Sequence, residues 1–467
     1  MIANKIDFSK KNNIEKKIPF SLLIVSLIIT ISLSICSILR HNLYQSNVYD
    51  LGLFDQWLWL IGQDSLAISS MAKVHVLSDH AAWVLYLFSP LYKLYPSSNL
   101  LFVSQAFALS FTSVPLWLLS KQKGLSNQNI WIICFLWWLQ PVVFNANLFD
   151  FHPEVWAMPG IAICFLLNRA NLFLPWLAMI FLILGCRDGL VLLVAGFGIE
   201  QALRKRWKWS CFAFLISICW LLFLKFFLYP FLSSISGGHF GATEGALKSF
   251  YLTFINPETS INIDYSGGLI YILLISLPFI PFWKKNSIKT ISIWIPLACL
   301  NFFSANPSYR TLIHHYNLPI ALIGVISVID VLNYKISNRM RWFKLYWIII
   351  CWFALAKPYF FTGPYLSRLH QLKDINAAIE NVSSKERVLT TSYIAPHLSH
   401  RKTIRYAKIG SFDDAILEDI DVILLNPLDP GWDSDNTTQS LILDFADQSG
   451  WYCKKYENGL ELCKAND

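Results

Sequence analysis

The side chains in this sequence that could do chemistry lie in short polar segments between long apolar runs. A carboxylate can take the proton of an acceptor hydroxyl, and arginine can bind phosphate oxygens through two hydrogen bonds. Gathered at one membrane face, these residue types would suit a substrate that carries a lipid phosphate. The residues are Asp50, Asp55, Asp79, His80, Asp150, His152, Glu154, Arg187, Asp188, Arg310, His314 and His315.

Each of these side chains also has an ordinary structural explanation, because loops are polar and Asp commonly caps helices. For Asp50 the functional interpretation is favoured, since Asp50 and Asp55 interrupt a strongly apolar stretch. Asp55 is then either a partner of Asp50 or a solvated group. Lys225, within FLKFFLY, is unusual at membrane depth. We expect it to extend to one end of its helix rather than to bind a substrate.

The composition is that of an integral membrane protein. Of 467 residues, 55% are hydrophobic and only 15% are charged. The net charge of +8 is spread in small basic clusters between apolar runs, which argues against nucleic acid as a partner. Most of the 10 cysteines lie in apolar segments without metal-ligand spacing. Cys453 and Cys463 flank a turn and could form a disulfide if the tail is extracytoplasmic.

The apolar runs predict a polytopic α-helical membrane protein with about eleven transmembrane helices, since a helix needs roughly 20 apolar residues to cross a bilayer. A basic N-terminus, 1–17, lies inside, and the first apolar run lacks a cleavage site and is kept as a helix. The alternation of basic loops puts the tail outside the cytoplasm. The expected spans are 18–39, 99–119, 129–149, 155–168, 171–186, 190–203, 210–232, 267–283, 290–304, 318–333 and 343–360.

This transmembrane bundle, 18–360, has four expected external loops: 40–98, 147–154, 233–266 and 305–317. The first is far longer than a connector. Apolar residues at helical spacing predict a helix on the membrane surface, N-capped by Asp50. A second surface helix is expected to start near Asp79. Pro153 and Glu154 mark a further helix start.

The tail, 361–467, has an ordinary composition and predicts a small soluble α/β domain. A short amphipathic helix is expected at 371–381 and another helix at 438–448. Strands are expected at 387–391 and 421–425, and a hairpin at 451–464 turns at Asn458-Gly459.

Five segments resemble a family of bacterial and archaeal membrane proteins known as domain of unknown function 2079. They are YDLGLFDQWLW, SDHAAWVLYLFSPLYKLYP, NLFDFHPE, CRDGL and TSYIAPHLSHR, in the order of the family, and the resemblance runs from about Tyr49 to the tail. Where the family usually has Lys-Glu-Asp, this chain has Cys186-Arg187-Asp188, so only Asp188 is carried over. The family name implies no activity.

In its layout the sequence is also similar to the GT-C superfamily of membrane glycosyltransferases, which have a helical bundle and a large first external loop with surface helices. That resemblance implies sugar transfer from a polyprenyl-phosphate carrier with inversion at the anomeric carbon. Asp50 matches the essential acidic residue of that loop. His80 occupies the place where related enzymes have a residue near the donor phosphate.

The leading hypothesis is therefore a glycosyltransferase in the bacterial plasma membrane, acting at the extracytoplasmic face. Asp50 would be the general base, with Asp55 or Asp150 assisting it or binding a divalent cation such as Mg²⁺ or Mn²⁺. Its partners would be the bilayer, a polyprenyl-phosphate sugar donor, and a glycan, lipid or protein acceptor of the envelope. The expected substrate- and phosphate-binding residues are His80, Asp150, His152, Glu154, Asp188, Arg310 and His314.

Two alternatives remain. A lipid or glycan transporter would need polar or broken helices near the midplane, whereas the expected spans are mostly Leu, Ile, Phe and Trp. A non-catalytic envelope assembly protein would use its tail to bind a partner.

Overall fold

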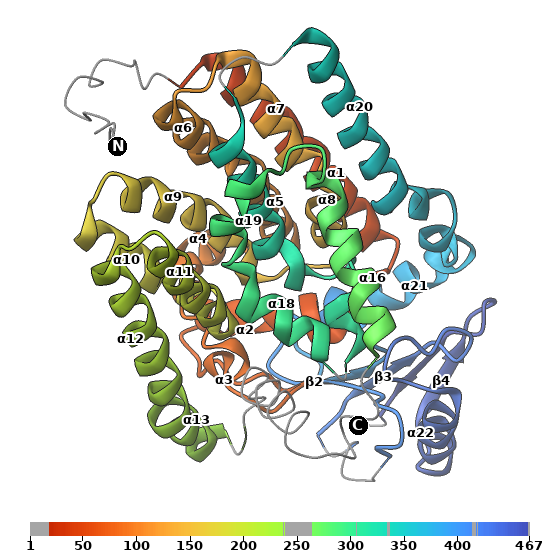
Figure 1. Ribbon diagram of the computed structural model, residues 1–467. Coiled ribbons are helices and arrows are strands. Elements are labelled where there is room, and N and C mark those ends of the chain that lie inside the picture. The colour runs from red at the N-terminus through yellow and green to blue at the C-terminus, as the bar shows by residue number, and fades with distance from the viewer. Residues whose placement is uncertain are drawn as a thin grey trace, which may run out of the picture.

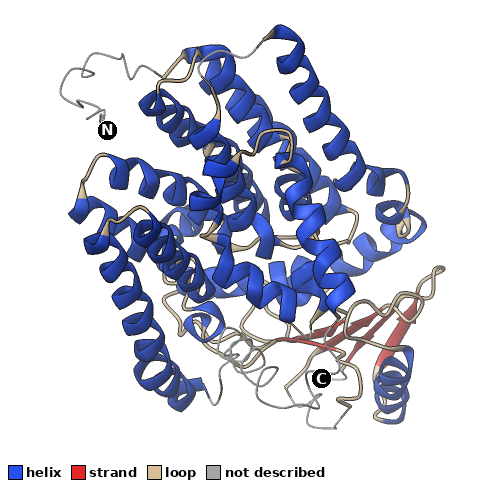
Figure 2. Cartoon of the chain, in the orientation of Figure 1, coloured by secondary structure: helices blue, strands red, loops and turns tan. Residues whose placement is uncertain are grey.

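The computed structural model describes residues 18–236, 238, 264–304, 306–333, 337–412, 417 and 419–465. The basic N-terminus and most of the loop 233–266 lie outside these described residues. Over the described residues the chain is mostly helical, with one small sheet at a single edge of the molecule (Figure 2).

The helices follow the apolar runs, several of which break into two helices. Their bounds are α1 Phe20–Asn42, α2 Leu53–Gly62, α3 Val76–His80, α4 Val84–Leu94, α5 Ser98–Phe111, α6 Ser113–Lys123, α7 Asn127–Trp138, α8 Pro141–Leu148, α9 Ala157–Arg169, α10 Phe173–Leu184, α11 Val191–Leu203, α12 Trp207–Phe223, α13 Tyr229–Ser236, α16 Tyr265–Ser276, α17 Ile288–Ile291, α18 Trp294–Phe303, α19 Leu318–Val331, α20 Asn338–Leu355, α21 Leu372–Glu380 and α22 Asn436–Gln448.

Among the described residues, four helical segments are long and apolar enough to cross a membrane: Phe20–Asn42, Ser98–Lys123, Asn127–Leu148 and Trp207–Ser236. A fifth is added if α20 and the bent segment after it form one span. Shorter apolar helices have 10–17 residues. A helix of 12 residues such as α10 is about 18 Å long, well short of a bilayer core of about 30 Å. The prediction of about eleven spans is therefore not confirmed.

The tail forms a five-stranded mixed sheet with strand order β2-β1-β3-β5-β4. Strand β1 is parallel to β2 and β3, whereas β5 is antiparallel to β3 and β4. Cys453 and Cys463 face each other across β4 and β5 and form a disulfide. The strands are β1 Val388–Thr390, β2 Ile404–Tyr406, β3 Val422–Leu425, β4 Tyr452–Lys455 and β5 Glu461–Lys464.

These elements confirm the two strands, the hairpin and the helices (α21 and α22) predicted in the tail. Strand β2 was not predicted, because its three residues give no alternating pattern long enough to recognise.

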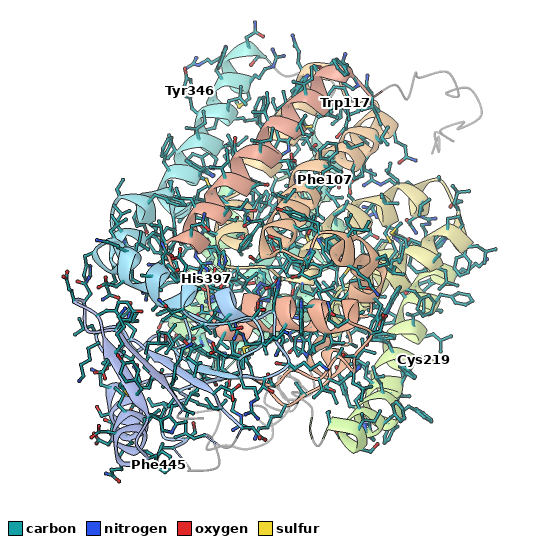
Figure 3. All side chains as sticks on the ribbon, turned by 180° about the vertical axis from the view of Figure 1, so that it is seen from behind. Phe107, Trp117, Cys219, Tyr346, His397 and Phe445 are labelled. Carbon is teal, nitrogen blue, oxygen red and sulfur yellow. A yellow bond between two sulfur atoms is a disulfide. The ribbon has the colours of Figure 1, made fainter. Side chains whose placement is uncertain are left out.

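The tail packs against the long loop 40–98 at one end of the bundle, which we call the sheet end (Figure 1). Helix α2 lies in this interface, and Trp57 and Leu58 are fully buried in one apolar cluster with residues of β1, β2 and β3. Figure 3 shows His397 of the tail where the C-terminal ribbon meets the first helices. This differs from the prediction of a helix lying on the membrane surface, because the tail covers the helix.

Two predicted helix starts are also wrong. Asp50 does not cap α2, because it lies inside a wide π-helical turn, Val48–Gly52, that runs directly into that helix. Asp79 is part of α3, and the next helix begins only at Val84. Pro153 does open a helical turn, Pro153–Trp156, with Glu154 in it as predicted.

Candidate functional site

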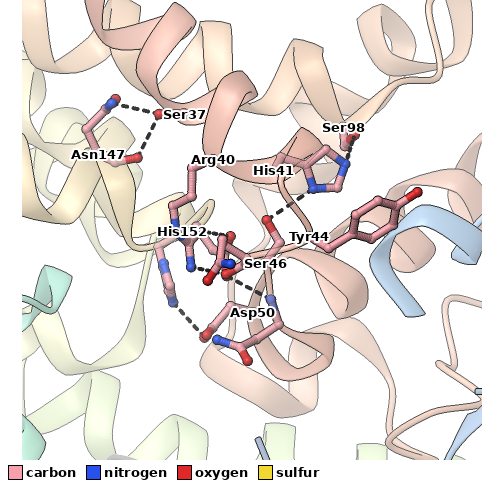
Figure 4. Close-up of polar contacts among 12 residues, drawn as sticks. Ser37, Arg40, His41, Tyr44, Ser46, Asp50, Ser98, Asn147 and His152 are labelled. Atoms are coloured by element: carbon pink, nitrogen blue, oxygen red, sulfur yellow. Dashed lines mark hydrogen bonds and ion pairs between the residues drawn. The ribbon is translucent and has the colours of Figure 1, made fainter. Parts of the chain in front are cut away.

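Asp50 and His152 are the centre of a polar cluster at the sheet end of the bundle. His152 Nε2 lies 3.0 Å from Asp50 Oδ1 (Figure 4). The Asp50 side chain is 22% exposed, and among the described residues His152 is the hydrogen-bond partner of its carboxylate. One carboxylate oxygen is thus oriented by an imidazole while the group keeps access to solvent, which is the arrangement that a general base needs.

His152 is itself fixed from two sides. Its backbone N–H donates to Gln105 Oε1 at 3.0 Å, and Gln105 Nε2 donates to the carbonyl oxygen of Asp150 at the same distance. Its ring stacks on that of His315, with 3.6 Å between ring centroids. The loop before Pro153 therefore holds the imidazole in one position relative to Asp50.

A buried acid and a buried arginine continue the cluster beyond His315. His315 Nε2 lies 3.6 Å from Glu154 Oε2, and the same carboxylate oxygen accepts a hydrogen bond from Arg187. The Arg187 guanidinium also lies over the Tyr316 ring, 4.8 Å from its centroid. Burial lowers the pKa of Arg187, but the Glu154 charge, the nearby Tyr316 and Tyr309 and the hydrogen bond to Glu154 together raise it more, so the net shift is upward. The guanidinium therefore stays charged.

A pocket opens beside this arginine. Glu154, Arg187 and Tyr316 line its polar side, and Leu190, just before α11, and two leucines of α18 line its apolar side. Arg187 Nε is buried and has no hydrogen-bond partner within the described part of the chain. A cation with an unused donor, next to an apolar wall, suits a ligand with an anionic head and a hydrocarbon chain.

His80 and Asp188 form the other edge of the cluster. His80 Nδ1 lies 3.4 Å from Asp188 Oδ1, and His80 Nε2 lies 3.6 Å from Asp79 Oδ1. Tyr229 donates to Asp188 Oδ2 at 2.8 Å. Burial lowers the pKa of His80, but Asp79 and Asp188 raise it more, so the net shift is upward and favours the imidazolium.

The loop that carries Asp188 is held against the loop that carries His80. The backbone N–H of Val84 donates to the carbonyl oxygen of Gly185 at 3.1 Å. A side chain at position 185 would collide with the ring of Trp83. Gly185 therefore allows the close approach that brings His80 and Asp188 together.

His314 and His315 differ from His80 in the direction of their pKa shifts. Burial lowers the pKa of His314 to about 4 and lowers that of His315, next to His152, as well. Both imidazoles are therefore neutral near pH 7 and can act as hydrogen-bond donors or acceptors. His314 packs edge-on against Phe149, with 4.3 Å between the centroids, so it lines the same cluster.

Asp150 has a structural environment. Its fully buried carboxylate pairs with Arg40 at the end of α1 and accepts a hydrogen bond from the backbone N–H of Asn47 at 3.0 Å. These contacts fasten the turn that carries Asp50 to the loop that carries His152.

Asp55 lies in the interface with the tail, away from Asp50. Its carboxylate accepts hydrogen bonds from Tyr92 and Ser399, and His400 Nε2 lies 3.0 Å from it. Asp55, like Asp50, comes from the loop 40–98, but the partners of its carboxylate are Tyr92 and two residues of the tail.

Arg310 is likewise placed elsewhere. It donates to the carbonyl oxygens of Phe302 and Ser304, and it pairs with Asp264 at 3.4 Å. Arg187 takes the position beside the acids and histidines that was expected for Arg310.

The carboxylates considered as metal ligands are not gathered in one group. Asp55 and Asp150 are each held by the partners described above. The part of the chain that the structure describes contains no group of three or more His, Cys, Asp or Glu that could hold a metal ion.

The part of the sequence that contains the polar cluster matches a known protein family. The model of the family described as predicted membrane protein (DUF2079) matches residues 40–462. The chain belongs to this family. No curated protein matches the sequence of this chain.

The match to the DUF2079 family covers every residue of the polar cluster, from Asp50 to Tyr316, and nearly all of the tail. The family description and the apolar helices identify a membrane protein.

Proposed function

We propose that this protein is a glycosyltransferase that moves a sugar from a polyprenyl-phosphate donor to an envelope acceptor at the extracytoplasmic face of the plasma membrane. The observation that carries the proposal is the partly exposed Asp50 carboxylate, held by His152 beside a buried arginine and an amphipathic pocket.

In this reaction Asp50 is the general base. The acceptor hydroxyl oxygen attacks the anomeric carbon of the donor sugar while Asp50 removes the hydroxyl proton. The bond between the anomeric carbon and the phosphate oxygen breaks, and its electron pair leaves with the polyprenyl phosphate. The His152 N–H on Asp50 Oδ1 orients the carboxylate, so that the other oxygen faces the acceptor.

Negative charge grows on the leaving phosphate, and cations near it lower the barrier. Arg187 and the imidazolium of His80 supply positive charge in this cluster. The apolar wall of the pocket beside Arg187 suits the first part of the polyprenyl chain. Glu154 and Asp188 hold the two cations in place rather than contact the phosphate.

Mass spectrometry of envelope glycans and lipid-linked sugars tests the proposal in three strains: wild type, gene deletion, and Asp50→Asn at normal abundance. The deletion and Asp50→Asn strains are expected to lose the same glycan and to accumulate the same lipid-linked precursor. If the deletion alters the glycans but Asp50→Asn does not, the protein acts in transport or assembly and Asp50 is not the base.

Asp64→Asn is the matched control. Asp64 lies in the same loop as Asp50, but its side chain is 85% exposed and pairs only with Lys93, 2.9 Å away, among the described residues. The Asp64→Asn strain is expected to keep the wild-type glycan.

A further inference from the structure

An aromatic cluster borders the candidate active site on the side of the tail. The Tyr49 ring makes edge-on contacts with Tyr406 and Trp432, at centroid distances of 5.5 and 5.2 Å. Tyr49 precedes Asp50, so the two Cα atoms are only about 3.8 Å apart. Within the π-helical turn, Asp50 points to His152 of the bundle, whereas Tyr49 points to the tail.

Polar groups surround these rings. Tyr406 donates to the Tyr49 hydroxyl and lies 3.0 Å from Asp433 Oδ2. Lys408 Nζ lies 3.4 Å from the Tyr49 hydroxyl and 3.9 Å from Asp433 Oδ2. One ammonium and one carboxylate balance each other, so the cluster has no net charge.

The loop that presents Trp432 is firmly built. Arg368 pairs with both carboxylate oxygens of Asp429 and lies over the Tyr393 ring, 3.7 Å from its centroid. The backbone N–H of Ile409 donates to the carbonyl oxygen of Asp433 at 2.9 Å. Trp432 is nevertheless 54% exposed. The loop, held by these contacts, therefore keeps a large ring in contact with solvent.

We propose that Tyr49, Tyr406, Lys408, Trp432 and Asp433 form a binding site for a neutral oligosaccharide, namely the glycan part of the acceptor. An exposed indole packs against the C–H face of a pyranose, because both surfaces are apolar and flat. Hydroxyl, carboxylate and ammonium groups around it can then bond the sugar hydroxyls. The balanced charge favours a neutral glycan over an anionic polymer.

That the bound glycan is the acceptor rests on the proposed function. The position of the aromatic cluster beside Asp50 supports that link. The turn that carries the base also carries Tyr49, so a glycan bound on the aromatic rings would have its end near Asp50.

Binding is tested with full-length protein in nanodiscs by saturation-transfer NMR. The probe is a set of oligosaccharides released by mild acid from the envelope of the wild-type strain. Wild type and Asp50→Asn are expected to bind one neutral oligosaccharide equally well. Trp432→Ala should weaken binding at least tenfold, and Trp432→Phe should restore part of it.

Tyr452→Ala is the matched control, since Tyr452 is an aromatic residue of the tail that is 72% exposed and lies on β4. It should bind like wild type. Equal binding by Trp432→Ala and wild type, or no binding of any neutral oligosaccharide by wild type, would overturn the proposal. An envelope protein that binds wild type but not Trp432→Ala, with no oligosaccharide binding, would make the cluster a protein-docking surface instead. Because Asp50→Asn is expected to bind, failure of the transferase proposal is read separately from failure of this one.

Discussion

Two polar clusters are buried at opposite ends of the helical bundle, and they differ in how completely their hydrogen bonds are made. At the end away from the sheet, Asp330 of α19 bonds Arg169 through one oxygen and Arg204 and Thr290 through the other. Glu200 bonds Arg204 and its neighbour Gln201. All four carboxylate oxygens have donors, and two arginines balance two acids.

The cluster around Asp50 also contains acids and an arginine, but it adds histidines, and not all of its hydrogen-bonding groups have partners. Buried nitrogens of His152 (Nδ1), His315 (Nδ1) and Arg187 (Nε) have no hydrogen-bond partner within the described residues. A polar group buried without a partner costs free energy, so such atoms persist where a ligand can bind them. The complete cluster around Asp330 ties helices together, whereas the incomplete one around Asp50 leaves nitrogens that the proposed substrate could bond.

Asp330→Asn should cause the largest loss of stability. It removes the negative charge from two arginines, and breaking one side of a buried ion pair costs about 3 kcal/mol. The melting temperature in nanodiscs should fall on the order of 5 °C, while protein that remains folded keeps its transfer rate. An unchanged melting temperature would remove the distinction between the two clusters.

Acid should destabilise the sheet end first. The pKa of buried His397 is about 4 in the folded protein, below about 6.5 in the unfolded chain. Between pH 6.5 and 4 only the unfolded chain takes up this proton. The free energy of unfolding therefore decreases as the pH is lowered through this range, by up to about 3 kcal/mol. His397→Phe keeps the stacked ring on His41 and should flatten the pH dependence of the melting temperature. If the melting temperature of His397→Phe depends on pH as strongly as that of the wild type, another group causes the acid sensitivity.

Arg187→Gln should raise the KM for the lipid-linked precursor about 30-fold, the equivalent of about 2 kcal/mol for a lost hydrogen bond to a charged group. Because Glu154 would then be left unpaired, the double variant Arg187→Gln/Glu154→Gln separates the two effects. The KM stays high in the double variant if Arg187 binds phosphate. It returns to the wild-type value if Arg187 only neutralises Glu154.

Tyr229→Phe should have the smallest effect. It removes the hydrogen bond from Tyr229 to Asp188 Oδ2, and Asp188 is the residue that positions His80. The loss of about 1 kcal/mol should lower the transfer rate about fivefold. The pH at which the rate falls with His80 deprotonation should move as well, since Asp188 raises the pKa of that imidazole. A fivefold loss without such a move would indicate a purely structural role.

Local patterns predicted the tail well, because α21, α22 and the hairpin at Asn458-Gly459 follow from periodicity and turn residues. The number of spans could not be predicted as well, since apolar runs also form short buried helices such as α19, whose residues pack inside the bundle.

The site residues show the same limit. His152 and Glu154 were recognised because they flank Pro153 in a short polar loop. Asp55 was assigned to the site because it lies near Asp50 in sequence, but its partner Ser399 is 344 residues away. The roles of Arg187 and His315 depend on contacts between separate loops, and no spacing in the sequence reveals such contacts.

The central claim, that Asp50 is the base of a sugar transfer, is tested most directly with purified protein in nanodiscs. The substrate is the lipid-linked precursor that accumulates in the deletion strain, with the envelope acceptor added. Asp50→Asn should transfer sugar about 10²- to 10⁴-fold more slowly than wild type at an unchanged melting temperature. Transfer by Asp50→Asn at the wild-type rate would contradict the account.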